Sequence, residues 1–171
     1  HQQLEQQAVT DPLTGLLNRR GFYQAAEAAL LRNEHSEKVQ ALMYMDLDGF
    51  KRINDSLGHE AGDEILHWVA SQLKECLGSE ALLARMGGDE FTALFDGLPY
   101  PELAGRFAER VLERLSISHQ VDGVDVSLGV SIGIATYPDC GGTFEGLLRA
   151  ADTAMYAAKH AGRQQYRFYD Q

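Results

Sequence analysis

Hydrophobic residues recur every three or four positions in several stretches of the chain, which is the period of one face of an α-helix. This pattern predicts helices over residues 19–31, 63–77, 101–115 and 144–161, with a shorter helix over 50–57. Pro12 and Gly15 interrupt the chain before the first of these helices, because the residue before a proline avoids helical geometry and glycine permits a turn. The Gln-rich residues 1–9 that precede this break are expected to be the end of a connecting helix.

Five other segments have the pattern of β-strands, at residues 39–45, 81–86, 91–95, 126–134 and 166–169. The first is a nearly continuous apolar run, which indicates a strand buried on both faces. In 126–134 large apolar residues alternate with serine and glycine, so another element is expected to pack closely on the small-residue face. Gly87 and Gly88 separate the second and third segments and supply the positive φ angles that a tight hairpin requires.

Strands separated by helices predict an α/β (α+β) fold, in which helices cover the faces of a central sheet. The hairpin requires an antiparallel pair, so the sheet is expected to be mixed. A chain of 171 residues has the size of one domain with one sizeable core. This domain is expected to span residues 10–171.

Composition places the chain among soluble globular domains, with 44% hydrophobic and 23% charged residues. No apolar run reaches membrane-spanning length, and no signal-peptide pattern is present. A formal net charge of −10 argues against a nonspecific binder of nucleic acid or anionic membranes.

Cys76 and Cys140 share no metal-ligand spacing, so one core thiol and one loop thiol in a reducing cytoplasm are expected. Because the first residue is His1, the chain is expected to be part of a longer protein.

The tip of the predicted hairpin, at residues 87–90, is the first candidate ligand-binding site. Asp89 and Glu90 directly follow two glycines, so two acids lie beside backbone that no side chain covers. Such a place can hold a metal and a phosphate. The same residues also form an ordinary turn, since turns favour glycine and aspartate for conformational reasons alone.

Asp46 follows the buried strand 39–45, at the sheet edge where ligand sites of α/β proteins commonly lie. If Asp46 and Asp89 lie on adjacent strands, two carboxylates converge. Hard oxygen ligands suit Mg²⁺, which can bridge a triphosphate and stabilise an attacking or leaving oxygen. The alternative is that Asp46 caps the short helix that begins near Phe50.

Candidate anion contacts flank these acids. Gly49 precedes a helix start and exposes backbone N–H groups, and Lys51 adds a positive charge nearby. Lys159 and Arg163, at the end of the last helix, can neutralise terminal phosphates. Alternatively, Lys51 is a solvated helix lysine, and the other two stabilise the helix dipole.

Asn54 and Asp63 bracket a glycine-rich break between two helices. A carboxylate accepts hydrogen bonds from N1–H and the exocyclic amine of guanine, whereas adenine would leave the acceptors unsatisfied. These two residues are therefore candidates for guanine recognition. The alternative is that Asp63 caps its helix.

Five ordered motifs resemble the GGDEF family of bacterial diguanylate cyclases. They are residues 11–19 (DPLTGLLNR), 46–55 (DLDGFKRIND), 58–63 (GHEAGD), 87–91 (GGDEF) and 157–163 (AAKHAGR). The resemblance runs from about Thr10 to Tyr169, and five motifs at compatible spacing are far more specific than one. It implies a palm-like fold similar to that of nucleotidyl cyclases and polymerases, with a mixed sheet of about five strands.

The resemblance also implies an activity and a set of site residues. Two GTP molecules would condense into cyclic di-GMP with release of two pyrophosphates, in an active site that forms between the two protomers of a homodimer. The metal, Mg²⁺ or Mn²⁺ in its place, would be bound by Asp46, Asp89 and the Leu47 carbonyl, with Glu90 as a further acid that acts as base or metal ligand. Asn54 and Asp63 would select guanine, and Gly87 and Gly88 would let the hairpin backbone approach the nucleotide closely. The residues that would contact phosphates are Gly49, Phe50, Lys51, Lys159 and Arg163.

One stretch departs from the family pattern. Many members carry an inhibitory Arg-x-x-Asp site whose aspartate precedes the first glycine by six residues, and here Gly78–Ala81 (GSEA) occupies that position. We therefore expect weak or absent product inhibition, which a titration of turnover with cyclic di-GMP would test. The C-terminal residues resemble those of domains that a phosphodiesterase domain follows, so further sensor or phosphodiesterase domains are expected in the parent protein. The resemblance implies a cytoplasmic domain, which a parent anchored at the inner membrane can carry.

Two alternatives remain at this point. One is a catalytically silent GTP-binding module that regulates an attached domain, although such a module would be expected to lose the acids that this chain retains. The other is a cyclase with relaxed base choice, against which Asp63 argues.

Overall fold

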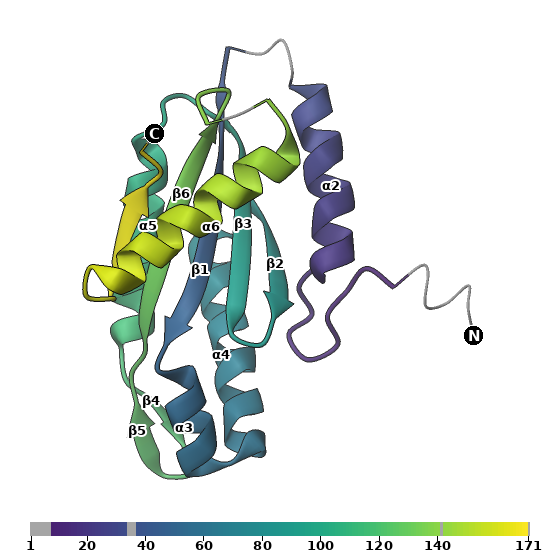
Figure 1. Cartoon of the computed structure of the whole chain (residues 1–171). Coiled ribbons are helices and arrows are strands. Elements are labelled where there is room, and N and C mark those ends of the chain that lie inside the picture. The colour runs from purple at the N-terminus through teal and green to yellow at the C-terminus, as the bar shows by residue number, and fades with distance from the viewer. Residues whose placement is uncertain (1–7, 34–36, 141, 171) are drawn as a thin grey trace.

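A five-stranded mixed sheet forms the centre of the protein in a computed structural model that describes residues 8–33, 37–140 and 142–170 (Figure 1). Its strands are β1 (Val39–Asp48), β2 (Ala81–Gly87), β3 (Glu90–Leu98), β6 (Gly129–Tyr137) and β7 (Gln165–Phe168). They lie in the order β2-β3-β1-β6-β7, and all neighbours are antiparallel except β6 and β7. The α/β class, the mixed sheet and its five strands were predicted from the sequence and are confirmed.

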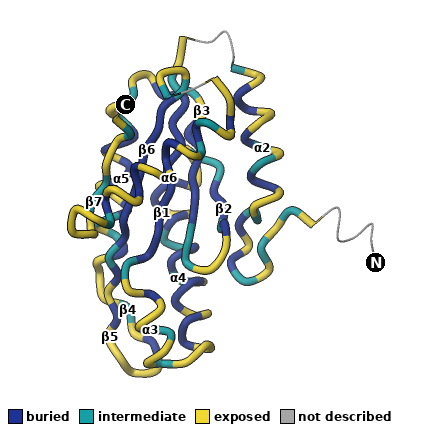
Figure 2. Tube along the Cα trace, viewed as in Figure 1, coloured by how far each residue is buried: buried dark blue, intermediate teal, exposed yellow. Residues whose placement is uncertain are grey.

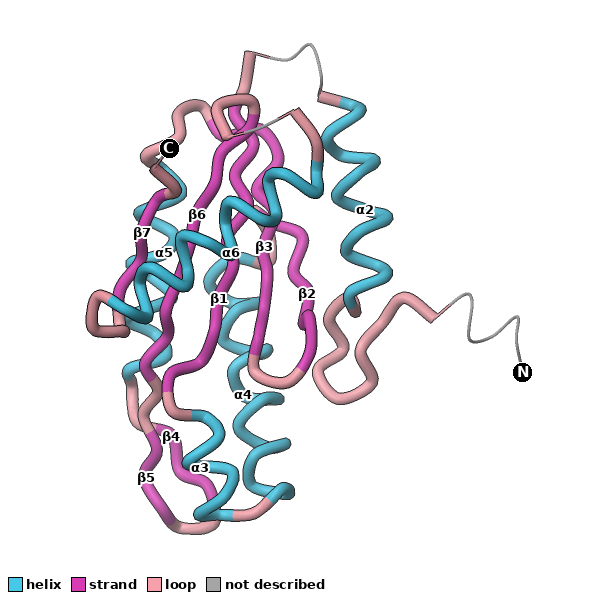
Figure 3. Tube along the Cα trace, in the orientation of Figure 1, coloured by secondary structure: helices cyan, strands magenta, loops and turns pink. Residues whose placement is uncertain are grey.

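Helices cover both faces of this sheet (Figure 3). Their bounds are α2 (Arg19–Arg32), α3 (Phe50–Leu57), α4 (His59–Leu77), α5 (Leu103–Ser116) and α6 (Phe144–His160). Buried residues of α2 and α6 pack with Leu42 and Tyr44 of β1, whereas α4 and α5 pack with Met43 and Met45. Successive strand residues point to opposite faces, so β1 separates two hydrophobic layers and is buried along most of its length (Figure 2).

The beginning of α4 differs from the prediction. Gly58, with φ 94°, is the only residue between α3 and α4, and α4 begins at His59 instead of Asp63. The first turn of α4 exposes polar side chains and has no apolar period, so it resembled a loop in the sequence. Gly62 was interpreted as part of a break, but it is buried inside the helix.

A two-stranded sheet was not predicted from the sequence. It consists of β4 (His119–Val121) and β5 (Val124–Val126), joined by Asp122 and Gly123 with φ 52° and 77°. An Asp-Gly pair is a strong hairpin signal, so this element was detectable. The alternating segment 126–134 therefore spans the end of β5 and most of β6.

The small-residue face of β6 is packed as closely as its pattern predicts. A Cβ atom added to Gly133 would lie 2.1 Å from the Ala151 carbonyl oxygen and 2.1 Å from the Met155 nitrogen. These are backbone atoms of α6, which no rotamer change can move. Gly133 thus fixes the distance between α6 and the sheet, and so the positions of the α6 side chains that point toward the site.

Several other expectations concern the chain ends and the cysteines. The connecting helix predicted over residues 1–9 lies mostly outside the described residues, and Ala8 and Val9 are not helical. Both cysteines are free, with Cys76 buried and Cys140 half-buried. No helix in the described part of the chain is long and apolar enough to cross a membrane.

Candidate active site

The hairpin between β2 and β3 turns at Gly88 and Asp89. Gly87 and Gly88 have φ angles of 147° and 49°, and a Cβ atom added to either would meet no atom within 4 Å. Glycine is needed here for backbone conformation, while the space around it is open. The tip therefore combines a rigid turn with backbone that a ligand can approach.

This tip lies against the end of β1. The Leu47 N–H donates to the Asp89 carbonyl oxygen at 3.2 Å, and Asp46 is paired with Glu90 across the two strands. Directly paired residues on antiparallel strands point to the same face. The structure thus brings together Asp46, Asp89 and Glu90, from two segments more than 40 positions apart in the sequence.

Arg85 connects the hairpin tip to the turn before α2, a contact that was not predicted from the sequence. Its Nε donates to the Gly88 carbonyl oxygen at 3.0 Å, and its Nη1 lies 3.2 Å from Asp11 Oδ1. Asp11 also accepts hydrogen bonds from the N–H and Oγ1 of Thr14. Burial opposes the charged form of Asp11, but these hydrogen bonds and Arg85 outweigh it and lower its pKa. The turn before α2 is thereby tied to the hairpin.

Asp89 lies beside Asp46 in an environment that disfavours the charged form of Asp89. Burial, followed by the charge of Asp46, raises the pKa of Asp89 to about 6. Asp46 is 8% exposed, and its Oδ1 has no hydrogen-bond partner among the described residues. Its other oxygen lies 2.6 Å from Lys159 Nζ. The alternative role of Asp46 as a helix cap is wrong, because Gly49 with φ 73° occupies the N-cap of α3.

This arrangement fits a divalent cation that completes its ligand shell with other oxygens. Across residues 8–33, 37–140 and 142–170, no three His, Cys, Asp or Glu side chains are arranged so that they could hold a metal ion by themselves. Mg²⁺ typically binds one or two carboxylates together with water and substrate phosphates. The unpartnered Asp46 oxygen and the strained Asp89 carboxylate are donors suited to that mode.

Glu90 accepts a hydrogen bond from a tyrosine of the neighbouring strand β1. The hydroxyl of Tyr44, a residue 6% exposed, donates to Glu90 Oε1 at 2.9 Å. Burial and Glu90 raise the pKa of Tyr44 well above its usual value, so the phenol remains a donor. Tyr44 lies two residues before Asp46 on the same face of β1, and this contact was not predicted.

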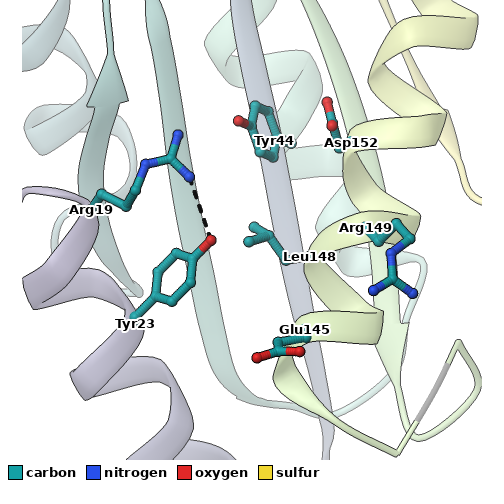
Figure 4. Close-up of a pocket in the computed structure, with 7 residues that line it drawn as sticks. All are labelled: Arg19, Tyr23, Tyr44, Glu145, Leu148, Arg149 and Asp152. Carbon is teal, nitrogen blue, oxygen red and sulfur yellow. Dashed lines mark hydrogen bonds between the residues drawn. The ribbon is translucent and has the colours of Figure 1, made fainter.

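A cavity of about 360 Å³ opens beside Tyr44 between α2 and α6 (Figure 4). Arg19 donates to the Tyr23 hydroxyl at 3.4 Å on the α2 side. On the α6 side, burial and the charge of Asp46 raise the pKa of Asp152. The charge of Asp46 therefore acts on a residue that lines the cavity. The lining residues are Arg19, Tyr23, Tyr44, Glu145, Leu148, Arg149 and Asp152.

The candidate guanine contacts lie on the α3–α4 pair. A Cβ atom added to Gly62 would lie 2.1 Å from Asn54 Oδ1, so this glycine lets Asn54 pack against α4. Asn54 Nδ2 lies 3.3 Å from His59 Nδ1. Asp63 follows Gly62 and is exposed, within the helix rather than at its cap, so the capping alternative is wrong. Both side chains remain accessible to a ligand, and their role remains a prediction.

The predicted phosphate contacts come from two segments of the chain. Gly49, Phe50 and Lys51 begin α3 directly after β1, with Phe50 buried and Lys51 exposed. Lys159 lies in the last turn of α6, and Arg163 Nε is 4.0 Å from Asp48 Oδ1. The two basic residues pair with Asp46 and Asp48 here, and their contact with phosphate stays a prediction.

Comparison with known proteins agrees with this geometry. The family model "Diguanylate cyclase, GGDEF domain" matches residues 8–165. The diguanylate cyclase TpbB of Pseudomonas aeruginosa is 41% identical over 94% of this chain and 37% of its own length. An uncharacterized signaling protein of Caulobacter vibrioides is also 41% identical, over 93% of this chain and 20% of its own length. The chain thus spans well under half the length of these relatives.

Solved structures show the same architecture. The GGDEF domain of TpbB from Pseudomonas aeruginosa is 38% identical, with a TM-score of 0.91 and coverage of 94% of both chains. The GGDEF domain of DgcB from Caulobacter crescentus, in complex with c-di-GMP, is 29% identical with a TM-score of 0.85, covering 96% of this chain and 97% of that one. With the family model matched over most of its length, this chain belongs to the GGDEF family of diguanylate cyclase domains.

Proposed function

We propose that this domain is a diguanylate cyclase, which condenses two GTP molecules into cyclic di-GMP and releases two pyrophosphates. The observation that carries the proposal is the convergence of Asp46, Asp89 and Glu90 beside Lys159. The reaction joins the 3′-hydroxyl of one GTP to the α-phosphate of another. One protomer holds one GTP, so the complete site requires a homodimer in which two hairpin tips face each other.

The acids and the basic residues have complementary tasks in this proposal. Asp46 and Asp89, with the Leu47 carbonyl, would hold the cation, while Lys51, Lys159 and Arg163 neutralise phosphate oxygens. When bound, Mg²⁺ or Mn²⁺ would supply positive charge that offsets the negative charge of the phosphates and of the leaving pyrophosphate. Glu90, oriented by the Tyr44 hydroxyl, is the further acid beside these groups and serves as base or metal ligand.

The remaining residues place the nucleotide. Asn54 and Asp63 bind the guanine edge, and the N-terminus of α3 after Gly49 offers backbone N–H groups to phosphate. Gly87 and Gly88 leave the hairpin backbone open to the nucleotide. Because adenine presents a lone pair at N1 where Asp63 needs a donor, we expect strong preference for GTP over ATP.

A product assay tests the proposal directly. The domain, at high concentration with Mg²⁺, is incubated with GTP, ATP or both, and dinucleotides are identified by mass. We expect cyclic di-GMP from GTP and no product that contains adenine. GTP binding without any dinucleotide, even when the domain is fused to a dimeric coiled coil, would instead identify a silent regulatory module. Relatives such as PdeR of Escherichia coli, named a cyclic di-GMP phosphodiesterase and 38% identical over 93% of this chain, make that second outcome worth testing.

Substituting Gly62 with alanine is expected to weaken GTP binding without destabilising the domain. The new Cβ would displace Asn54 Oδ1 from its present position 2.1 Å away. Alanine within a helix is favoured over glycine by about 1 kcal/mol, which offsets the local crowding. We expect the KM for GTP to rise about tenfold, which corresponds to the loss of one good hydrogen bond. Thermal unfolding and GTP titration check the two effects separately.

The matched control is Gly142→Ala, since Gly142 has nothing within 4 Å of an added Cβ atom. This control should leave both the KM and the melting temperature unchanged. An unaltered KM in Gly62→Ala would show that Asn54 does not contact the base.

A further inference from the structure

Asp48 is a carboxylate with no role in the mechanism above, although it lies two residues beyond Asp46 on the same face of β1. Its side chain is 10% exposed. Ser131 Oγ donates to Asp48 Oδ1 at 2.7 Å, and the Gln164 N–H donates to Asp48 Oδ2 at 3.0 Å. Both oxygens are thus occupied by protein donors, which makes Asp48 an anchor.

The anchored segment has an unusual backbone. Gly162, Arg163 and Gln164 have consecutive φ angles of 119°, 62° and 50°. The left-handed region is unfavourable for residues with a Cβ atom, so two such non-glycine residues in succession need external support. Asp48 supports the Gln164 amide, and the Val130 N–H donates to Gln164 Oε1 at 3.2 Å.

The absence of a side chain at Gly129 lets Asp48 and Gln164 lie close together. It is paired with Asp48 across β1 and β6. A Cβ atom added to Gly129 would lie 2.5 Å from Gln164 Oε1 and 3.0 Å from Asp48 Oδ2. Residues of β1, β6 and the turn after α6 therefore meet in one close-packed polar cluster, formed by Asp48, Ser131, Gln164 and the backbone at Gly129 and Val130.

The cluster sets the course of the chain between α6 and β7, where the basic residues lie. Arg163 belongs to the left-handed turn itself, and its Nε is 4.0 Å from Asp48 Oδ1. Lys159 lies one turn earlier, with Nζ 2.6 Å from Asp46 Oδ2. Movement of the turn would carry Arg163 away from the acids and loosen the end of the helix that holds Lys159.

We propose that Asp48 is a positioning residue, which holds the turn at residues 162–164 so that Arg163 and Lys159 face the nucleotide's β- and γ-phosphates. This inference rests on the proposed function, because it requires phosphates to bind beside Asp46 and Asp89. Asp48 acts through the basic residues and does not touch the nucleotide. Its loss should therefore weaken binding of the triphosphate and leave binding of the base and ribose unchanged.

The test compares two ligands in the presence of Mg²⁺, a nonhydrolysable GTP analogue and GMP. In Asp48→Ala, we expect the analogue to bind about tenfold more weakly, the equivalent of one charge-assisted contact, while the affinity for GMP changes less than about twofold. Amide hydrogen exchange at Gln164 should become faster in the same variant. Asp125→Ala, which removes an exposed carboxylate on β5, should change neither property.

Several outcomes would overturn the inference. Unchanged affinity for the analogue in folded Asp48→Ala does so, and so does an equal loss of affinity for both ligands, which is the signature of a merely structural role. If the alanine variant does not fold, a cycle of Asp48→Asn with Arg163→Ala replaces it. We expect the asparagine variant alone to weaken binding of the analogue, and to cause a smaller loss in the Arg163→Ala background, where only its effect through Lys159 remains. Fully additive effects, or no effect of Asp48→Asn, contradict the proposal.

These binding measurements need no turnover, so they separate the two proposals. A wild-type domain that binds the analogue but forms no cyclic dinucleotide refutes the proposed activity, while the Asp48 comparison still gives its answer. A wild-type domain without preference for the triphosphate over GMP refutes the role of Asp48.

Discussion

Replacing Gly133 with alanine is expected to lower the free energy of unfolding by about 3 kcal/mol, the upper part of the range for overpacked cores. The added methyl group would lie 2.1 Å from backbone atoms of both Ala151 and Met155. Side-chain rearrangement cannot relieve this overlap, so α6 must move away from β6. For a domain of this size the melting temperature should fall by roughly 6–12 °C. Thermal denaturation followed by circular dichroism measures the change.

The same change made at Gly142 is the control, because no atom lies within 4 Å of a Cβ there. Gly142→Ala should melt within about 1 °C of the wild type, as exposed substitutions without special backbone demands usually do. A Gly133→Ala variant with the wild-type melting temperature would show that α6 does not pack this closely on the sheet. Because α6 carries Lys159, the destabilised variant should also bind GTP more weakly.

Periodicity predicted most of this fold because most elements bury one face or both. The alternation of β6 and the apolar run of β1 follow directly from their places at the centre of the sheet. The beginning of α4 was misplaced because its first turn, at His59 and Glu60, is exposed and has no apolar period. The β4–β5 hairpin was overlooked because its strands have only three residues each, too short for alternation to be visible.

The candidate site divides in a similar way. The glycines and acids of the hairpin were identified because their residue types and spacing have local meaning. The contacts of Tyr44, Arg85 and Asp48 were not, since each joins segments far apart in the sequence. Tyr44 reaches Glu90 because strand register brings β1 and β3 together, and Asp48 reaches Gln164 because the turn after α6 lies against the end of β1. Register depends on the whole sheet, and no local pattern reports it.

The largest effect on activity is expected from Asp89→Asn. Asparagine suits the turn as well as aspartate does, so the hairpin should form. The variant lacks a carboxylate for the cation, whose stabilisation of the transition state is worth several kcal/mol. A loss of about 4 kcal/mol corresponds to a decrease of roughly 1000-fold in the rate of cyclic di-GMP formation. Product mass spectrometry under saturating GTP and Mg²⁺ measures it.

The same substitution should stabilise the metal-free domain at high pH. Burial and Asp46 raise the pKa of Asp89 from 3.8 to about 6, so the folded state binds the proton more tightly than the unfolded state. Wild-type stability therefore falls as pH rises from about 4 to about 6, and the deficit persists above that range. Asp89→Asn removes this charge, so its gain in melting temperature over the wild type should be larger at pH 8 than at pH 4.

Added Mg²⁺ should reverse that order, because a cation that binds only the folded wild type raises its stability. Asp122→Asn is the matched control, since Asp122 is an exposed turn residue whose φ angle of 52° also tolerates asparagine. It should leave activity, pH dependence and the response to Mg²⁺ unchanged. An Asp89→Asn variant that melts below the wild type at pH 8 without metal would contradict the strained carboxylate pair. One that keeps its turnover would exclude Asp89 from the reaction, and the hairpin would then be a turn with acids of no catalytic consequence.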